Sequence, residues 1–176
     1  DIFGDTAGRM AQQWSDRGGY EGFAEHVQQS AAPYATAPVS LDVWRKVRPT
    51  SSFPAHLLLK ATALCSGDAQ AESLALTLRQ RFFVDAVDIS CWENLIMIAV
   101  DAKLDRTTLD AAINSGRAAA ALMADYQQAR QQQVKGSPSW VMNAGRQILY
   151  GNVGYRVLSA NIDELLHQPE VEACWC

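Results

Sequence analysis

The chain has 176 residues, a net charge of −4 and an apolar share of 48%. This length suits one domain, or one domain with an insertion, and it allows a sizeable core. No apolar run approaches the roughly 20 residues that a membrane helix needs, and the basic residues are scattered singly, so the sequence predicts a soluble protein that binds neither membranes nor nucleic acid.

The N-terminal segment, residues 1–50, predicts short helices interrupted by glycines and prolines. We expect one helix over 7–17 and a second over 20–30, with a glycine pair between them. Residues 31–37 have the composition of a loop, and Ser40 is expected to cap a short turn. Residues 1–5 resemble the tail of a strand that runs into a loop, and the rest of this segment is predicted to be helical and loop.

Residues 51–134 predict an all-helical block of four or five helices. Ser52 is expected at the N-cap of the first helix and Asp68 at that of the second. The run 90–93, Ser-Cys-Trp-Glu, has the spacing of a capping box, in which a serine hydroxyl and a glutamate carboxylate satisfy each other's backbone donors. Asp105 is expected to cap a later helix in the same way.

In residues 135–176 the spacing of apolar residues changes from the helical period to one typical of strands. Short β-type runs over 140–143 and 146–150 are joined by Ala144 and Gly145, which favours a hairpin. A final amphipathic helix follows and is expected to stop at a proline. We expect Ile162, Leu165 and Leu166 of this helix to face a sheet, and we expect Pro169 to end the helix.

The run 136–143, Gly-Ser-Pro-Ser-Trp-Val-Met-Asn, is the most specific motif. A proline cannot donate to a strand ladder, so Pro138 fits the start of a strand. If the Ser137–Pro138 bond is cis, the backbone N–H and C=O of Ser137 are free to pair with an extended ligand. The alternative is a trans proline that only marks the loop between helix and strand.

This run resembles the Gly-x-Pro loop of the DsbA-like thioredoxin superfamily. The order of a helical insertion, the loop, a hairpin and a last helix is similar to the branch that holds FrnE-type oxidoreductases, 2-hydroxychromene-2-carboxylate isomerases and kappa-class glutathione transferases. The resemblance implies an α/β fold, with a thioredoxin-like sheet incomplete at the N-terminus and a large all-helical insertion. It divides the chain into 1–50, 51–134 and 135–176, the last being the thioredoxin-like part.

The resemblance implies a thiol-disulfide oxidoreductase whose Cys-x-x-Cys lies in a segment missing before Asp1, with Ser137 and Pro138 binding the substrate. Two alternatives stay open: a glutathione-dependent isomerase or transferase, and a non-catalytic binding module. The expected partner is a protein or small thiol or disulfide, with glutathione as the one candidate co-substrate and a homodimer as an open alternative. A cytoplasmic location is implied, with the periplasm as the alternative.

The four cysteines form no Cys-x-x-Cys, so the catalytic residues are not identified. Cys91 lies where a helix N-terminus would favour a thiolate, yet its apolar neighbours favour a packed thiol. Cys65, near a helix end, is expected in packing. Cys174 and Cys176 form a Cys-x-Cys at the end of the chain, where catalytic geometry is rarely held. With three histidines they give no zinc spacing, so no metal is predicted.

The remaining candidates are histidines and arginines. His26 and His56 have the pKa range of an acid or base, but a lone histidine is more often an ordinary hydrogen-bonded residue. Arg48, Arg146 and Arg156 have the charge to hold a carboxylate such as that of glutathione, and surface charge is the simpler interpretation.

Overall fold

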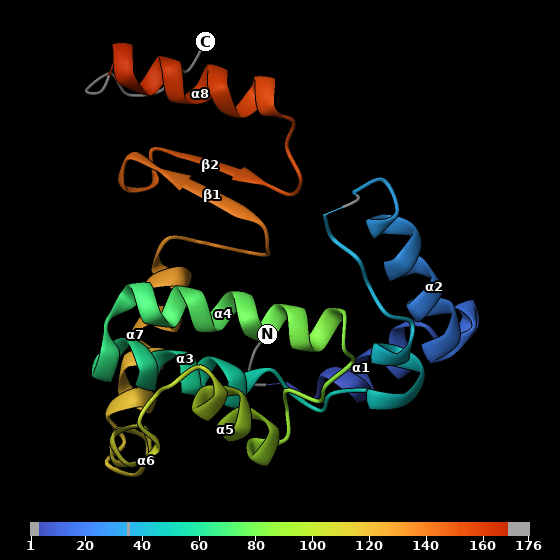
Figure 1. Cartoon of the computed structure of the whole chain (residues 1–176). Helices are drawn as coiled ribbons and strands as arrows, with labels where there is room; N and C mark the ends of the chain where they lie inside the picture. The colour runs from blue at the N-terminus through green and yellow to red at the C-terminus, as the bar shows by residue number, and fades with distance from the viewer. Residues whose placement is uncertain (1–3, 35, 169–176) are drawn as a thin grey trace. The chain divides into compact units, whose positions relative to one another are not determined.

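The computed structural model describes residues 4–34 and 36–168. Residues up to Leu122 form one compact unit, and residues from Met123 onward form a second. The sequence-based boundaries after residues 50 and 134 stay a prediction, because compactness does not test which segments fold independently. Within the described residues the secondary structure is mostly helical, with one small sheet (Figure 1).

The first unit begins with short helical elements. The expected first helix ends early, because α1 covers Thr6–Gln13 and a 3-10 turn covers Ser15–Arg17, whereas the second, α2 (Gly19–Ala31), is confirmed. A π-helical turn, η2 (Val43–Val47), follows the loop after α2. The hydroxyl of Ser40 accepts a hydrogen bond from the backbone N–H of Asp42, which confirms a capped turn there.

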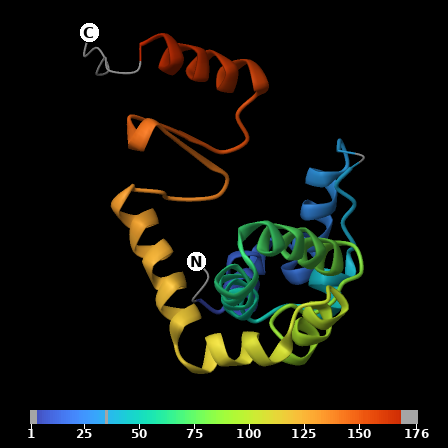
Figure 2. The same cartoon turned by 60° about the vertical axis from the view of Figure 1, so that its left-hand side comes forward.

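Five helices fill the expected helical block. They are α3 (Phe53–Ser66), α4 (Asp68–Phe83), α5 (Trp92–Asp101), α6 (Arg106–Asn114) and α7 (Arg117–Gln131). Ser52 occupies the expected N-cap position of α3, but its side chain makes no capping hydrogen bond. The cap at α6 is confirmed, because the Asp105 carboxylate accepts from the backbone N–H groups of Thr107 and Thr108. Figure 2 shows α3 and α4 side by side, as Figure 1 does.

Two expected caps are wrong. Gly67, not Asp68, is the N-cap residue of α4, and Asp68 is already the first helical residue. The capping box fails because the Ser90 hydroxyl donates to the Asp88 carboxylate at 2.6 Å, so it is engaged outside the helix. Cys91 then takes the N-cap position of α5.

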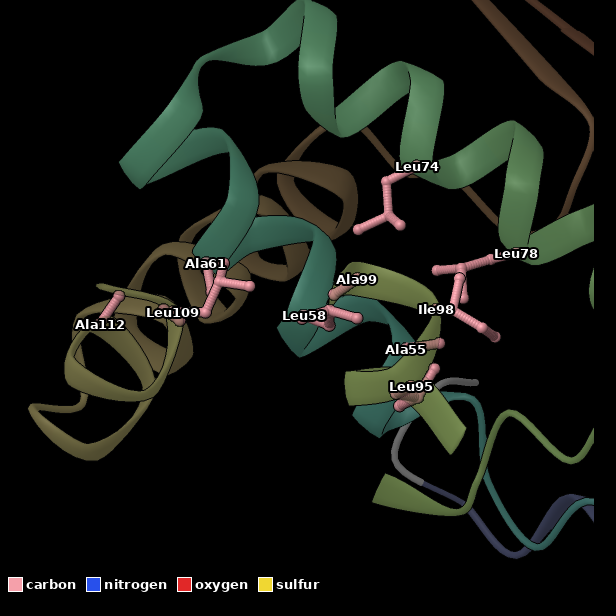
Figure 3. Packing of buried hydrophobic residues seen from close by; sticks show 11 residues of the cluster. Ala55, Leu58, Ala61, Leu74, Leu78, Leu95, Ile98, Ala99, Leu109 and Ala112 are labelled. Atoms are coloured by element: carbon pink, nitrogen blue, oxygen red, sulfur yellow. The ribbon is translucent and has the colours of Figure 1, made fainter. Parts of the chain in front are cut away.

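The core of the first unit lies where α3, α4, α5 and α6 meet. Leu58 from α3, Leu95 from α5 and Leu109 from α6 are almost fully buried. Figure 3 shows Leu74 and Leu78 extending from α4 toward this cluster. At roughly 1.5–3 kcal/mol for each fully buried large aliphatic side chain, this cluster is the main stabilising element of the unit. A second cluster joins the N-terminal helices to the block and contains Ala24, Val43, Trp44 and Phe82.

The second unit contains the hairpin. β1 (Ser139–Met142) pairs antiparallel with β2 (Gln147–Tyr150), with Trp140 opposite Leu149. The connection is longer than the expected Ala144–Gly145 turn, because a 3-10 turn, η3 (Asn143–Gly145), and Arg146 separate the paired strands. Asn143 and Ala144 there have positive φ angles of 48° and 54°.

The final helix, α8, spans Tyr155–His167. Its apolar face is less covered than the sequence predicted, since Ile162 and Leu166 are exposed and Leu165 is half-buried. Among the described residues no side chain of α8 is buried. The expected stop at Pro169 lies outside the described residues. In the part of the chain that the structure describes, no helix has the length and hydropathy needed to cross a bilayer.

Candidate ligand-binding loop

The Ser137–Pro138 loop leads directly into β1 and is tied to the turn after β2. The carbonyl oxygen of Pro138 accepts a 3.0 Å hydrogen bond from the backbone N–H of Gly151. Gly151 has a φ of +81°, which a residue without a Cβ adopts at little cost. The Ser139 hydroxyl donates to the carbonyl of Gly136 and closes the loop from the other side.

A tyrosine adds a second anchor. The Tyr150 hydroxyl at the end of β2 donates a 2.8 Å hydrogen bond to the carbonyl of Gln133, just after α7. Gln133 has a φ of 54°, so this bond secures a strained residue immediately before the loop. The segment leading into the loop and the segment leaving the hairpin are therefore held together by backbone and tyrosine contacts.

Ser137 itself is left open by these contacts. The Ser137–Pro138 peptide bond is cis, and both residues are exposed. Among the described residues, neither the backbone N–H nor the C=O of Ser137 has a hydrogen-bond partner. A peptide backbone that is exposed and unpaired beside a strand offers one donor and one acceptor to an extended ligand.

The strand after the loop also has a free edge. Within the described residues β1 pairs only with β2, so its other edge carries no strand. Trp140 lies one residue into β1 and is partly exposed, as is Tyr150 on β2. Trp140 lies opposite Leu149, so the adjacent pair, which contains Tyr150, faces the other side of the hairpin. The loop and the free edge of β1 therefore offer mainly backbone groups, which suit an extended peptide.

Cys91 is placed at a helix N-terminus, as expected, and is half-buried. Its thiol lies 3.1 Å from Oε2 of Glu93 and donates to that carboxylate. This hydrogen bond is the main cause that holds the pKa of Glu93 below its ordinary value. The Cys91 sulfur is thus engaged with Glu93, and it forms no disulfide within the described residues.

The other thiols supply no redox pair in the described residues. Cys65 is exposed, which corrects the expected packing role, and its Sγ lies 3.5 Å from the carbonyl oxygen of Thr108. Cys65 and Cys91 are both free. Cys174 and Cys176 lie outside the described residues. Within the described chain no group of three or more histidine, cysteine or acidic side chains is arranged to hold a metal ion.

The histidines and arginines are dispersed. The His26 ring stacks against Trp14 at 5.1 Å, and the Arg48 guanidinium lies 4.3 Å from the centre of the Tyr20 ring. Arg146 donates to the carbonyl of Gln168. Arg156 is exposed on α8, and His56 lines a groove beside α4. None of these side chains contacts the Ser137–Pro138 loop through a hydrogen bond or ion pair among the described residues.

A comparison with protein families shows to which family the chain belongs. The Thioredoxin_5 family model, described as thioredoxin, matches residues 13–149, well over half of the chain and including the whole loop. The chain belongs to this thioredoxin family. Its fold is accordingly thioredoxin-like and mixed α/β, with a large helical part. No curated protein matches the chain significantly.

Sequence reasoning placed Ser137 and Pro138 in a loop before a strand but missed the residues that hold this loop. None of Gln133, Tyr150 and Gly151 was singled out from the sequence as an anchor of the loop. The carbonyl of Gln133 carries no sequence signal, since any residue has one. Tyr150 and Gly151 depend on their residue type for these hydrogen bonds and backbone angles, so they are the anchoring residues that a sequence could indicate.

Proposed function

We propose that this chain forms the substrate-binding part of a DsbA-like thiol-disulfide oxidoreductase. The observation that carries the proposal is the exposed Ser137, two residues before β1, whose backbone N–H and C=O have no partner among the residues that the structure describes. An extended substrate pairs with these two groups as an added strand, which brings its disulfide or thiol to a fixed position.

The redox thiols of this reaction come from outside the described residues, because Cys65 and Cys91 form no Cys-x-x-Cys. In the reaction a thiolate attacks one sulfur of the substrate disulfide, so a mixed disulfide forms and the second substrate sulfur leaves as a thiolate. A second enzyme thiol then attacks the mixed disulfide, which releases the reduced substrate and leaves the enzyme oxidised. The role of Ser137 is to position the substrate while the sulfurs exchange.

Insulin reduction by the full-length protein tests this function, with a thiol regenerating the reduced enzyme. We expect turnover above the rate of the regenerating thiol alone, and we expect alkylation of the protein thiols to abolish it. Turnover that persists after complete alkylation contradicts the proposal. Absence of turnover in the full-length protein contradicts it as well.

A binding module without catalysis is the second candidate, and one observation favours it: no Cys-x-x-Cys occurs in the 176 residues. Such a module binds an unfolded cysteine-containing peptide at Ser137 but leaves its disulfide intact. The glutathione-dependent alternative needs no protein thiol, because glutathione supplies its own. Calorimetric titration separates the two, since saturable binding of glutathione is expected only for a glutathione-dependent enzyme.

A further inference from the structure

A groove runs beside α4 in the first unit, away from the loop described above. It consists of two adjoining hollows of about 520 Å³ and about 250 Å³. Arg79 and Phe83 line both hollows, so the two lie next to each other along the helix. Ligand pockets in proteins are commonly about 300–1,000 Å³, and the larger hollow alone falls within that range.

The walls of the groove are mainly apolar and incompletely covered. Leu76 is 57% exposed, and Val84 and Phe83 are also exposed. The loop at Pro38 forms the opposite wall of the larger hollow. That loop is held against the end of α4 by a 2.6 Å hydrogen bond from the backbone N–H of Ser40 to the carbonyl of Phe83. The apolar surface is therefore concave and supported by backbone contacts.

The polar groups in the groove carry positive charge or none. Among the described residues the Arg79 guanidinium has no hydrogen bond or ion pair. By contrast, Arg81, two residues further along α4, pairs with Asp85 at 3.1 Å. Burial, and then the charge of Arg79, lower the pKa of His56, so its imidazole is neutral near pH 7 and retains one N–H donor.

We propose that this groove binds an aliphatic carboxylate, with its carboxylate on Arg79 and its hydrocarbon chain along Leu76 and Phe83. Charge complementarity supports this occupant: the groove has an unpaired guanidinium and a neutral imidazole on an apolar floor. A guanidinium holds a carboxylate through two parallel hydrogen bonds. The hydrocarbon chain covers side chains that are otherwise exposed to water. This binding site is separate from the oxidoreductase function proposed above and does not depend on it.

Titration of the labelled chain with octanoate and with octanol, followed by NMR, tests the proposal. We expect saturable shifts at groove residues and at least about tenfold tighter binding of octanoate than of octanol, because only octanoate carries the charge that Arg79 recognises. Arg79→Gln is expected to remove this difference. Arg81→Gln is the matched control and is expected to keep it.

Further results test where octanoate binds and which group recognises its carboxylate. Leu76→Asp changes an exposed side chain, so the fold should survive, and its charge is expected to weaken octanoate binding by repulsion. Equal affinity for octanoate and octanol overturns the proposal, as does an equal loss in the Arg79 and Arg81 variants. Absence of saturable binding also overturns it, and that result is expected if another segment of the protein or a second protein fills the groove.

Discussion

The carbonyl oxygen of Pro138 and the backbone N–H of Gly151 lie 3.0 Å apart and join the loop before β1 to the turn after β2. This bond uses the Pro138 carbonyl, whereas the N–H and C=O of the neighbouring Ser137 have no partner in the described part of the chain. The proposed function requires these two roles: Pro138 secures the loop, and Ser137 before it offers hydrogen bonds to a ligand.

Removing a core leucine should separate buried from exposed positions on one helix. Leu95 is fully buried in α5, whereas Met97 on the same helix is 60% exposed. Leu95→Ala is expected to lower the free energy of unfolding by about 2–5 kcal/mol through lost burial and a residual cavity. Met97→Ala should stay within about 0.5 kcal/mol. Urea unfolding monitored by circular dichroism measures both, and equal losses would show that the α3–α6 core is packed differently.

The contact between α2 and the 3-10 turn at Ser15–Arg17 should not accept a Cβ at Gly22. A Cβ there would lie 1.9 Å from the carbonyl oxygen of Arg17. Alanine gains up to about 1 kcal/mol over glycine in a helix, but relief of this backbone clash must shift the chain. We therefore expect Gly22→Ala to destabilise the protein by about 1–3 kcal/mol. Gln28→Ala, at an exposed site of α2, is the control, and a more stable Gly22→Ala protein would contradict the close approach.

His56 should make stability depend on pH. Burial and the Arg79 charge lower its pKa below the ordinary value of 6.5, so the unfolded state binds more protons just below that value. The contribution of His56 to stability is therefore complete above pH 6.5 and falls as the pH drops toward the lowered pKa of the folded state. Thermal melting between pH 7.5 and 5 measures this, and His56→Gln should lose part of the decline. An unchanged pH profile in that variant would exclude His56 as a cause.

Asp105 should stabilise α6 mainly through its hydrogen bonds. Backbone and side-chain bonds from Thr108, followed by the backbone bond from Thr107, hold the pKa of Asp105 below its ordinary value. Its contribution is thus present at neutral pH and is lost as the pH falls through the lowered pKa. Asp105→Ala is expected to lower Tm and to speed amide exchange at the start of α6. Asp105→Asn keeps an acceptor and should retain most of the Tm, and identical losses in both variants would argue against capping.

Local signals were enough to predict most of the helices and the hairpin. Asp105 marks the start of a helix by its side-chain chemistry, and this role is confirmed. The capping box was wrong because Asp88, two residues before Ser90, competes for the serine hydroxyl. A pattern that spans four residues does not include that competitor.

Contacts between distant segments were beyond local reasoning. The groove depends on the loop at Pro38 meeting α4 near Arg79, about forty residues later, and neither segment has a motif that specifies the other. Sequence reasoning singled out His56 as a candidate but not Arg79, which lines the same hollow. The hydrogen bond from Tyr150 to the carbonyl of Gln133 was not predictable from local sequence either, since its acceptor is a backbone group that every residue has.

The proposed role of Ser137 predicts that its backbone N–H matters and its hydroxyl does not. Ser137→Pro removes the N–H, and Ser137→Ala keeps it while removing the hydroxyl. The N–H has no partner within the described residues, so its loss should leave the fold intact, which circular dichroism verifies. The proposal assigns the backbone N–H and C=O of Ser137 to substrate binding, and of these two groups only the N–H is removed in Ser137→Pro and kept in Ser137→Ala.

Insulin reduction by the full-length protein carrying each Ser137 variant is the most direct measurement. We predict that Ser137→Pro lowers kcat/KM by at least about tenfold, since a substrate hydrogen bond is lost, while Ser137→Ala stays near the wild-type value. Equal activity of the folded Ser137→Pro protein and the wild type would contradict the assignment of this loop as the substrate-binding edge.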